Sequence, residues 1–354
     1  MRAVTSGAGR RRFRGAILLV HQYAGFIFAA YLIVVCLSGA ALILLENQID
    51  GFRDYPMERV PVRGQRVPLS QMIRSVERAN PGLTVYHLLA SCPAGCTYDA
   101  SMHQGGDRLD ALVDPYTGTI VRTVVWQRTP VGILDDLHGS LMSGDTGAEV
   151  NAVAGLSLIV LSLTGLYLWP GWRSLRLGFT INRRSGAYRI SYDLHKVLGI
   201  LSMSFLVMWA LTGAGQVLWA EPPEPIAPVR HRGNSALGFD GLVRAGDAAL
   251  PGRMTMAYTA ANGVVVVRKQ VPGDPDPYGY SYVAVDRYTG RVTQVYDIRT
   301  FSPMWRLRTM LYAIHIGSPG GLVLRWTYAV VGTIPAISFA TAFLMWLYKL
   351  RRSQ

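Results

Sequence analysis

The stretch His21–Ala40, HQYAGFIFAAYLIVVCLSGA, decides the fold because it occurs twice in the chain. The later stretch His195–Ala214, HKVLGILSMSFLVMWALTGA, aligns with it without gaps, so that Gly25 falls on Gly199. Each stretch is apolar and reaches the ~20 residues that a helix needs to cross a bilayer. The recurrence therefore predicts two copies of one membrane helix.

A second pair of segments recurs in the same order. When His138 is placed over His315, Gly155 falls on Gly332 without gaps. Each repeat then reads helix, outside loop domain, helix, which predicts a parallel duplication with a pseudo-twofold axis along the membrane normal. Further matches are Thr164 with Thr341, Trp169 with Trp346, and the turn Asp114–Gly118 with the turn Asp286–Gly290.

The composition also places the chain in a membrane. Half of the 354 residues are hydrophobic and 16% are charged, whereas soluble domains carry about 25% charged residues. The net charge is +13, but the arginines cluster beside apolar segments, where they orient helices. We therefore expect contact with the lipid bilayer and no binding of nucleic acid.

The expected fold is a mainly α membrane protein, with a four-helix transmembrane bundle and two extracytoplasmic α+β domains. Arginine-rich flanks predict that both termini and the loop between the second and third spans are cytoplasmic. The parts are a basic N-terminus (1–14), helix 1 (15–45), a first loop domain with its interfacial histidine segment (46–142), helix 2 (146–171), a basic loop (172–191), helix 3 (192–219), a second loop domain with its histidine segment (220–320) and helix 4 (321–350).

The three cysteines suggest one disulfide. Cys36 lies inside an apolar run and is expected to pack as a small hydrophobic residue. Cys92 and Cys96 lie in a loop that we expect outside the cytoplasm, where disulfides persist. A disulfide between them is the favoured interpretation, and a metal-binding or free-thiol role stays open. Their spacing does not match the attachment motif of c-type haem.

Four histidines lie at the membrane boundary, two on each side. His21 and His195, the inner pair, lie near the cytoplasmic ends of helices 1 and 3, and His138 and His315, the outer pair, precede entry into the membrane from outside. Alternate helices of a four-helix bundle face each other across its axis, where cofactor sites are built. Two imidazoles from opposite sides are the axial ligands of a six-coordinate haem. The pattern therefore predicts two bis-histidine b-type haems.

Two glycines support this interpretation. Gly25 and Gly199 lie one helical turn after the inner histidines and on the same face, where the missing side chain leaves room for a flat macrocycle. Two alternatives stay open: the histidines could relay protons, or bind a transition metal with Asp135 and Asp136 beside His138. The remaining histidines, expected in solvated loops, are His87, His103 and His231.

The loop domains carry a recognisable pattern. A helical segment (Leu69–Ala79) is followed by strands and by the hairpin sequence Val-Asp-x-Tyr-Thr-Gly, which occurs at Val113–Gly118 and again at Val285–Gly290. This pattern resembles the PepSY domain. Together with the four spans and the His-x-x-x-Gly motifs, the chain from residue 15 onward resembles the PepSY-associated transmembrane family. Some members of this family resemble di-haem inner-membrane reductases that act on ferric siderophores.

The resemblance implies an enzyme: a di-haem oxidoreductase of the bacterial inner membrane. Electrons would pass from a quinol or a cytoplasmic reductase to the inner haem, then to the outer haem, and then to Fe(III) in a periplasmic siderophore. The released Fe(II) would serve iron uptake. The alternative is a non-enzymatic anchor whose PepSY-like loops bind or regulate a periplasmic peptidase or another envelope component. That alternative gives no reason for histidines at both faces.

Overall fold

The computed structural model describes residues 7–46, 58–90, 94–219, 237–260, 263–274, 276 and 278–352. The chain forms two compact units. The bundle unit consists of Met1–Leu44, Leu134–Trp219 and Val323–Gln354, and the sheet unit consists of Leu45–Ile133 and Ala220–Leu322. The helices predicted to span the membrane thus lie in one unit, and the two predicted loop domains lie together in the other.

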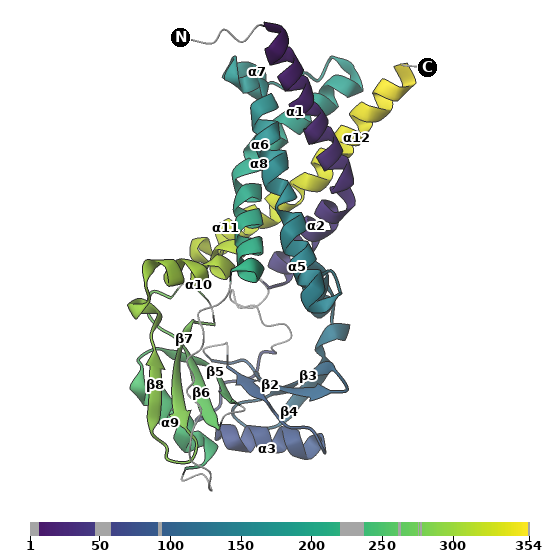
Figure 1. Ribbon diagram of the computed structural model, residues 1–354. Coiled ribbons are helices and arrows are strands. Elements are labelled where there is room, and N and C mark those ends of the chain that lie inside the picture. Colours follow the sequence, from purple (N-terminus) through teal and green to yellow (C-terminus); the bar gives the residue numbers. More distant parts are fainter. Residues whose placement is uncertain are drawn as a thin grey trace. The chain divides into compact units, whose positions relative to one another are not determined.

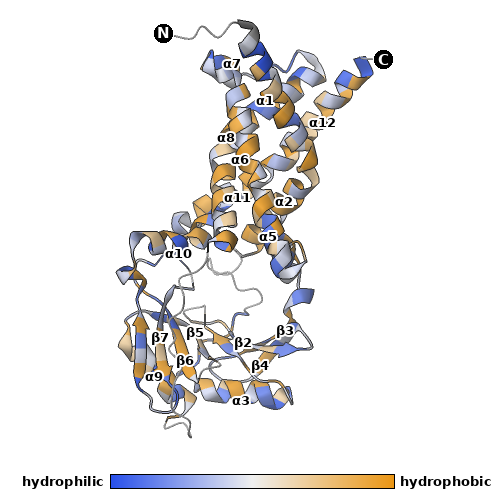
Figure 2. Ribbon diagram, in the orientation of Figure 1, coloured by the Kyte–Doolittle hydropathy of each residue, from blue (hydrophilic) through white to orange (hydrophobic). Residues whose placement is uncertain are grey.

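The bundle unit contains the apolar helices (Figures 1 and 2). Within the described residues, three helical stretches are long and apolar enough to cross a membrane, namely Gly144–Trp172, Gly186–Leu218 and Ser318–Arg352. The pair Gly9–Ile27 and Ala29–Leu45 makes a fourth span if its bend of 63° is accepted as a break within one crossing. The helices of these stretches are α1 (Gly7–Ile27), α2 (Ala29–Glu46), α5 (Gly144–Gly155), α6 (Ser157–Leu168), α8 (Gly186–Leu218), α11 (Gly321–Gly332) and α12 (Ile334–Arg352).

Three of the four predicted spans are not single straight helices. The first is broken at Phe28, the second after Gly155 and the last after Gly332. At Gly332, an added Cβ would lie 3.0 Å from the Cβ of Ala40 and 3.3 Å from the carbonyl oxygen of Cys36. Glycine therefore permits the close approach of α11 to α2, as small residues do between membrane helices.

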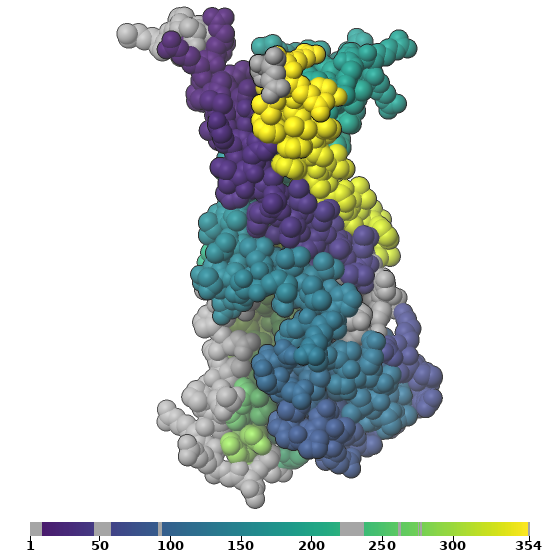
Figure 3. All heavy atoms as spheres, turned by 90° about the vertical axis from the view of Figure 1, so that its right-hand side faces the viewer, coloured from purple at the N-terminus to yellow at the C-terminus, as the bar shows by residue number. Residues whose placement is uncertain are grey.

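Contacts define the order of helices around the bundle. Helix α8 packs against α5, α6 and α12, and α1 packs against α6. Helices α1 and α12 lie side by side (Figure 3), with the rings of Phe26 and Phe339 6.1 Å apart between centroids. The cyclic order is therefore α1, α6, α8, α12, so that α1 and α8 are diagonal partners. Large apolar side chains such as Leu163 and Leu201 are exposed on the outside of the bundle, as expected for contact with lipid.

Short helices complete the bundle unit and lead out of it. Helix α4 (Pro130–Ser140) begins in the sheet unit and ends in the bundle unit, and α7 (Leu175–Phe179) lies in the basic loop. Helix α10 (Pro303–His315) belongs to the sheet unit. The segments that carry His138 and His315 are thus helical, as α4 and α10.

The sheet unit is one continuous antiparallel sheet with the strand order β4-β3-β2-β1-β5-β6-β7-β8. The first loop supplies α3 and strands β1 to β4, and the second supplies α9 and strands β5 to β8. Strands β1 and β5 join the halves, with His87 opposite Tyr258. The bounds are α3 (Leu69–Ala79), β1 (His87–Leu89), β2 (Tyr98–Gln104), β3 (Asp107–Val113), β4 (Ile120–Val125), α9 (Phe239–Ala249), β5 (Arg253–Thr259), β6 (Val264–Gln270), β7 (Ser281–Asp286) and β8 (Val292–Tyr296).

One face of the sheet packs against the two helices. Met72 and Val76 of α3 are fully buried against Ala100 and Ala111 of the first half, and Leu242 of α9 packs in the second core. Burying a Val, Leu or Met side chain contributes roughly 1.5–3 kcal/mol, so these two cores stabilise the sheet unit. The helix predicted at Leu69–Ala79 is confirmed with the same bounds.

The two predicted hairpin turns have the same local structure. The backbone N–H of Tyr116 donates to Oδ1 of Asp114 (2.8 Å), and that of Tyr288 donates to Oδ1 of Asp286 (2.7 Å). The glycine that ends each turn has positive φ, +74° at Gly118 and +71° at position 290, a conformation that other residues rarely adopt.

The structure describes one of the two cysteines of the predicted disulfide. Cys96 is buried and disulfide-bonded, and its predicted partner, Cys92, lies outside the described residues. Cys36 is a free thiol in α2, as its apolar surroundings predict.

Candidate functional site

The inner histidines meet across the bundle. His21 of α1 and His195 of α8 are half-buried, and their ring centroids lie 6.1 Å apart with the ring planes at 89°. They come from diagonal helices of the same unit. The sequence prediction that these two side chains face each other across the axis agrees with this geometry.

Hydrogen bonds fix the same tautomer on both rings. Nδ1 of His195 lies 2.9 Å from the carbonyl oxygen of Ser338, which can only accept, so Nδ1 carries the proton. Nδ1 of His21 lies 2.8 Å from Oγ1 of Thr164. That hydroxyl donates its own proton to a backbone carbonyl of α6 at 2.6 Å, so it accepts from His21. The proton on each ring is assigned from these hydrogen-bond partners, and it leaves the lone pair on Nε2.

A neutral imidazole that donates through Nδ1 and presents a lone pair at Nε2 is the usual state of a metal-ligating histidine. Metal–nitrogen bonds of roughly 2 Å on opposite sides of one ion, with each ring centre set farther back, give centroids roughly 6 Å apart. The separation of His21 and His195 is 6.1 Å. The two residues present therefore fit the axial positions of one haem.

The glycines beside the inner pair have no packing reason to be glycine. A Cβ added to Gly199 would meet nothing within 4 Å, and one added to Gly25 would meet Leu161 alone, at 3.8 Å. Both positions are half-buried. The space beside Gly199 is therefore not filled by described side chains, and the space beside Gly25 holds one ordinary contact, which suits the predicted room for a macrocycle.

His138 is held by α2. Its Nδ1 lies 2.8 Å from the carbonyl oxygen of Val35 and 3.4 Å from Oγ of Ser38. The carbonyl again requires a proton on Nδ1 and leaves the lone pair on Nε2. A Cβ on Gly39 would lie 2.6 Å from Cε1 of His138, so here glycine is required for the imidazole to reach the helix backbone. Unlike Gly25 and Gly199, Gly39 is explained by packing.

His315 is the last residue of α10 and is half-buried in the sheet unit. Because His138 belongs to the bundle unit, the pairing of the outer histidines stays a prediction. Within the described residues, there is no group of three or more His, Cys, Asp or Glu side chains that could hold a metal ion. A bis-histidine haem takes two ligands from the protein, so such a site does not need a group of three.

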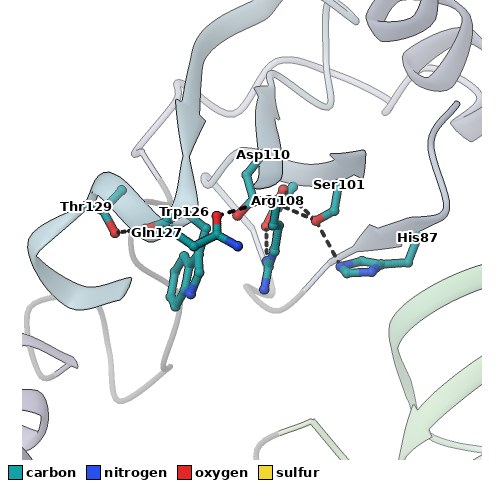
Figure 4. A network of polar contacts seen from close by, with 8 residues as sticks. His87, Ser101, Arg108, Asp110, Trp126, Gln127 and Thr129 are labelled. Carbon is teal, nitrogen blue, oxygen red and sulfur yellow. Dashed lines mark hydrogen bonds and ion pairs between the residues drawn. The ribbon is translucent and has the colours of Figure 1, made fainter. Parts of the chain in front are cut away.

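The prediction that His87 is a solvated loop residue is wrong. His87 lies in β1 (Figure 4), and its Nε2 is 3.1 Å from Oγ of Ser101, which donates to Oδ1 of Asp110 at 2.7 Å. Burial, and then the positive charge of Arg108, lower the pKa of His87 to about 4. His103 is exposed in β2, with its ring stacked on Tyr86, and His231 lies outside the described residues.

Arg108 links this network to the end of the first half-sheet. Its Nε donates to Oδ1 of Asp110 (2.7 Å), and its guanidinium lies 4.9 Å from the ring centre of Trp126. The backbone N–H of Arg108 donates to Oε1 of Gln127 (3.0 Å). Gln127 lies in the 3₁₀ turn Trp126–Arg128, at whose end the hydroxyl of Thr129 donates to the Trp126 carbonyl (2.8 Å). The network is rich in polar groups but is built inside the sheet, so we interpret it as structural.

Some supporting residues were missed from the sequence. Thr164 and Thr341 contact the two inner histidines, Thr341 with its Oγ1 3.3 Å from Nδ1 of His195. Their match between the two repeats was the signal in the sequence that could have identified them. The carbonyls of Val35 and Ser338 gave no signal, because any residue has one.

The fold is that of a multi-span membrane protein with a separate α+β unit. Its helical bundle carries a pair of histidines that face each other across the bundle axis. The family model for the PepSY-associated TM region matches residues 18–349. The chain therefore belongs to the PepSY-associated transmembrane family.

A segment of 101 residues is 35% identical to an uncharacterized protein of Pseudomonas aeruginosa. The match covers 28% of this chain and 25% of that protein. The chain thus spans about a quarter of the length of this curated relative.

Proposed function

We propose that this protein is a haem-dependent transmembrane electron-transfer enzyme that reduces a substrate outside the cytoplasm, Fe(III) in a siderophore. The observation that carries the proposal is the inner pair: two imidazoles on diagonal helices, with both Nδ1 atoms hydrogen-bonded and their centroids 6.1 Å apart. A bound haem supplies reversible one-electron chemistry. In this proposal the protein lies in the bacterial inner membrane.

The proposal includes a second haem, held by the outer pair. Its support is the equivalence of the two repeats. His21 contacts Thr164 and His195 contacts Thr341, which are matched positions in the sequence alignment. The sheet order, which runs outward from β1 in one half and from β5 in the other, has the same symmetry. A duplicated chain with one histidine of each pair in each repeat would carry one haem near each membrane face.

The protein's own residues have three tasks in this scheme. The inner histidines fix the cofactor, and Thr164 and Ser338 keep each Nδ1 protonated so that Nε2 can ligate. Gly25 and Gly199 leave space beside the ring. The apolar bundle keeps water from the path between the faces. Each Fe(III) takes one electron from a quinol or a cytoplasmic reductase, and the resulting Fe(II) is held more weakly by hard oxygen donors than Fe(III).

Vectorial reduction in proteoliposomes tests the function. The protein is reconstituted with a quinol in the membrane or a reductant inside, and a ferric hydroxamate or catecholate chelate is added outside with a chromogenic Fe(II) chelator. We expect Fe(II) outside in proportion to the protein, and its loss in His21→Ala and His195→Ala. Haem-loaded vesicles that transfer no electrons to any ferric chelate would contradict the proposed substrate. Haem-free protein would favour a PepSY module that binds an envelope component.

A further inference from the structure

The turn that follows His138 has an unusual backbone. Leu141 and Met142 have φ of +51° and +59°, and they are the two non-glycine residues with positive φ in the described part of the chain. This conformation is unfavourable for residues with a side chain, and it persists where surrounding contacts impose it. The turn connects α4, which carries His138, to α5, which begins at Gly144.

One side chain fastens this turn. Nδ2 of Asn151, one to two turns along α5, donates to the carbonyl oxygens of His138 (2.6 Å) and Gly139 (3.0 Å). These carbonyls are among the last of α4 and have no later helical N–H to accept from. Asn151 therefore satisfies the end of α4 and holds it close to α5.

The first span holds Asn151 in turn. The hydroxyl of Tyr31 donates to Oδ1 of Asn151 (2.7 Å) and lies 2.9 Å from the backbone carbonyl oxygen of Asn151. The contact at Oδ1 orients the amide so that its NH₂ group faces α4. The segment around His138 is thus attached to the first span twice, through the imidazole at Val35 and through the backbone at Asn151 and Tyr31.

The matched position in the second repeat is built differently. Asn151 corresponds to Tyr328, and Tyr31 corresponds to Phe205. These two rings contact each other edge to face, with centroids 5.7 Å apart. The polar contact of the first repeat is replaced by an aromatic one, so the clamp is a property of the His138 side and not a general feature of the bundle.

We propose that Asn151, oriented by Tyr31, is a positioning residue for His138: it holds the strained turn closed so that the imidazole stays on the Val35 carbonyl, in the orientation in which the proposed haem would bind it. The part of this inference that concerns haem rests on the proposed function. The clamp itself does not.

The test uses full-length protein in detergent or nanodiscs. The variants are Asn151→Ala, which removes the clamp, and Tyr31→Phe, which leaves the clamp without its orienting hydroxyl. Matched controls are Asn182→Ala, in the loop before α8, and Tyr188→Phe, in the first turn of α8. In haem-free protein, hydrogen exchange at Met142 and Ser143, whose N–H groups bond to α4 carbonyls, is expected to be roughly tenfold faster in Asn151→Ala, as for loss of about one hydrogen bond. Tyr31→Phe should give a smaller change in the same direction.

In haem-loaded protein, electron paramagnetic resonance distinguishes the ferric centres. We expect Asn151→Ala to change or broaden the low-spin signal that His138→Ala abolishes, and to leave the signal that depends on His21 unchanged. Equal exchange in wild type and Asn151→Ala would overturn the clamp. Faster exchange with an unchanged His138-dependent signal would overturn its positioning role. Wild type without haem would refute the proposed function, and the exchange experiment would still decide the clamp.

Discussion

Substitution of Gly199 by alanine separates a cofactor cavity from ordinary helix packing. An added Cβ meets no described atom within 4 Å, so the protein alone has no reason to resist it. Replacing glycine by alanine inside a helix stabilises the helix by up to ~1 kcal/mol. We therefore expect the haem-free Gly199→Ala variant to be as stable as wild type or slightly more stable in thermal unfolding.

The same methyl group would lie where a macrocycle between His21 and His195 needs space. Overpacking typically costs about 1–3 kcal/mol, which corresponds to roughly 5- to 150-fold weaker haem binding. Haem titration monitored by the Soret band measures this. Gly15→Ala, in α1, is the matched control, because its Cβ also meets nothing within 4 Å and it lies well before His21. Wild-type haem affinity in Gly199→Ala would refute the reasoning that this glycine makes room for the ring.

Further predictions concern the two units separately. Gly39→Ala should destabilise the protein by about 1–3 kcal/mol even without haem, because its Cβ would lie 2.6 Å from Cε1 of His138; unchanged thermal unfolding would contradict this. In haem-loaded protein, Thr164→Val should perturb the absorption spectrum of a haem bound by the inner pair more than Thr341→Val does, since His195 keeps the Ser338 carbonyl as a partner. Equal effects would argue against the assigned tautomers. The pKa of His87 is lowered from 6.5 to about 4, so the unfolded state binds more protons between these values and stability should fall with falling pH across this window, by up to roughly 3 kcal/mol. His87→Asn should flatten this dependence, and an unchanged slope would show that other groups cause it.

The sequence predicts much of the bundle because membrane helices leave a strong local signal. Apolar length located the spans, and spacing within the repeat placed His21 and His195 on facing helices. The bend at Phe28 had no comparable signal, since neither proline nor a polar insertion marks it.

The sheet unit was predicted less completely, because pairing between distant strands leaves little trace in either strand alone. The hairpin turns at Asp114 and Asp286 were predictable from residues that favour turns. The joining of the two loops through β1 and β5 was not, because β1 is short and its partner lies far along the chain. His87 was misjudged for the same reason: its burial comes from the neighbouring strands.

Support for the site histidines was partly visible in the sequence. Side-chain partners such as Thr164 appear as matched repeat positions, whereas backbone partners such as the Val35 carbonyl have no residue-specific signature. Glycines that resemble one another in sequence also differ in role: Gly39 is required by contact with His138, and Gly199 borders space that described atoms leave open.

The central claim is that His21 and His195 ligate one haem. The most direct measurement is the absorption spectrum of the purified protein, oxidised and dithionite-reduced, with the haem-to-protein ratio determined on the same sample. We predict low-spin b-type bands at about two haems per chain, falling to about one in both His21→Ala and His195→Ala. A colourless protein after expression with added haem precursor, or a ratio unchanged by both substitutions, would contradict the account.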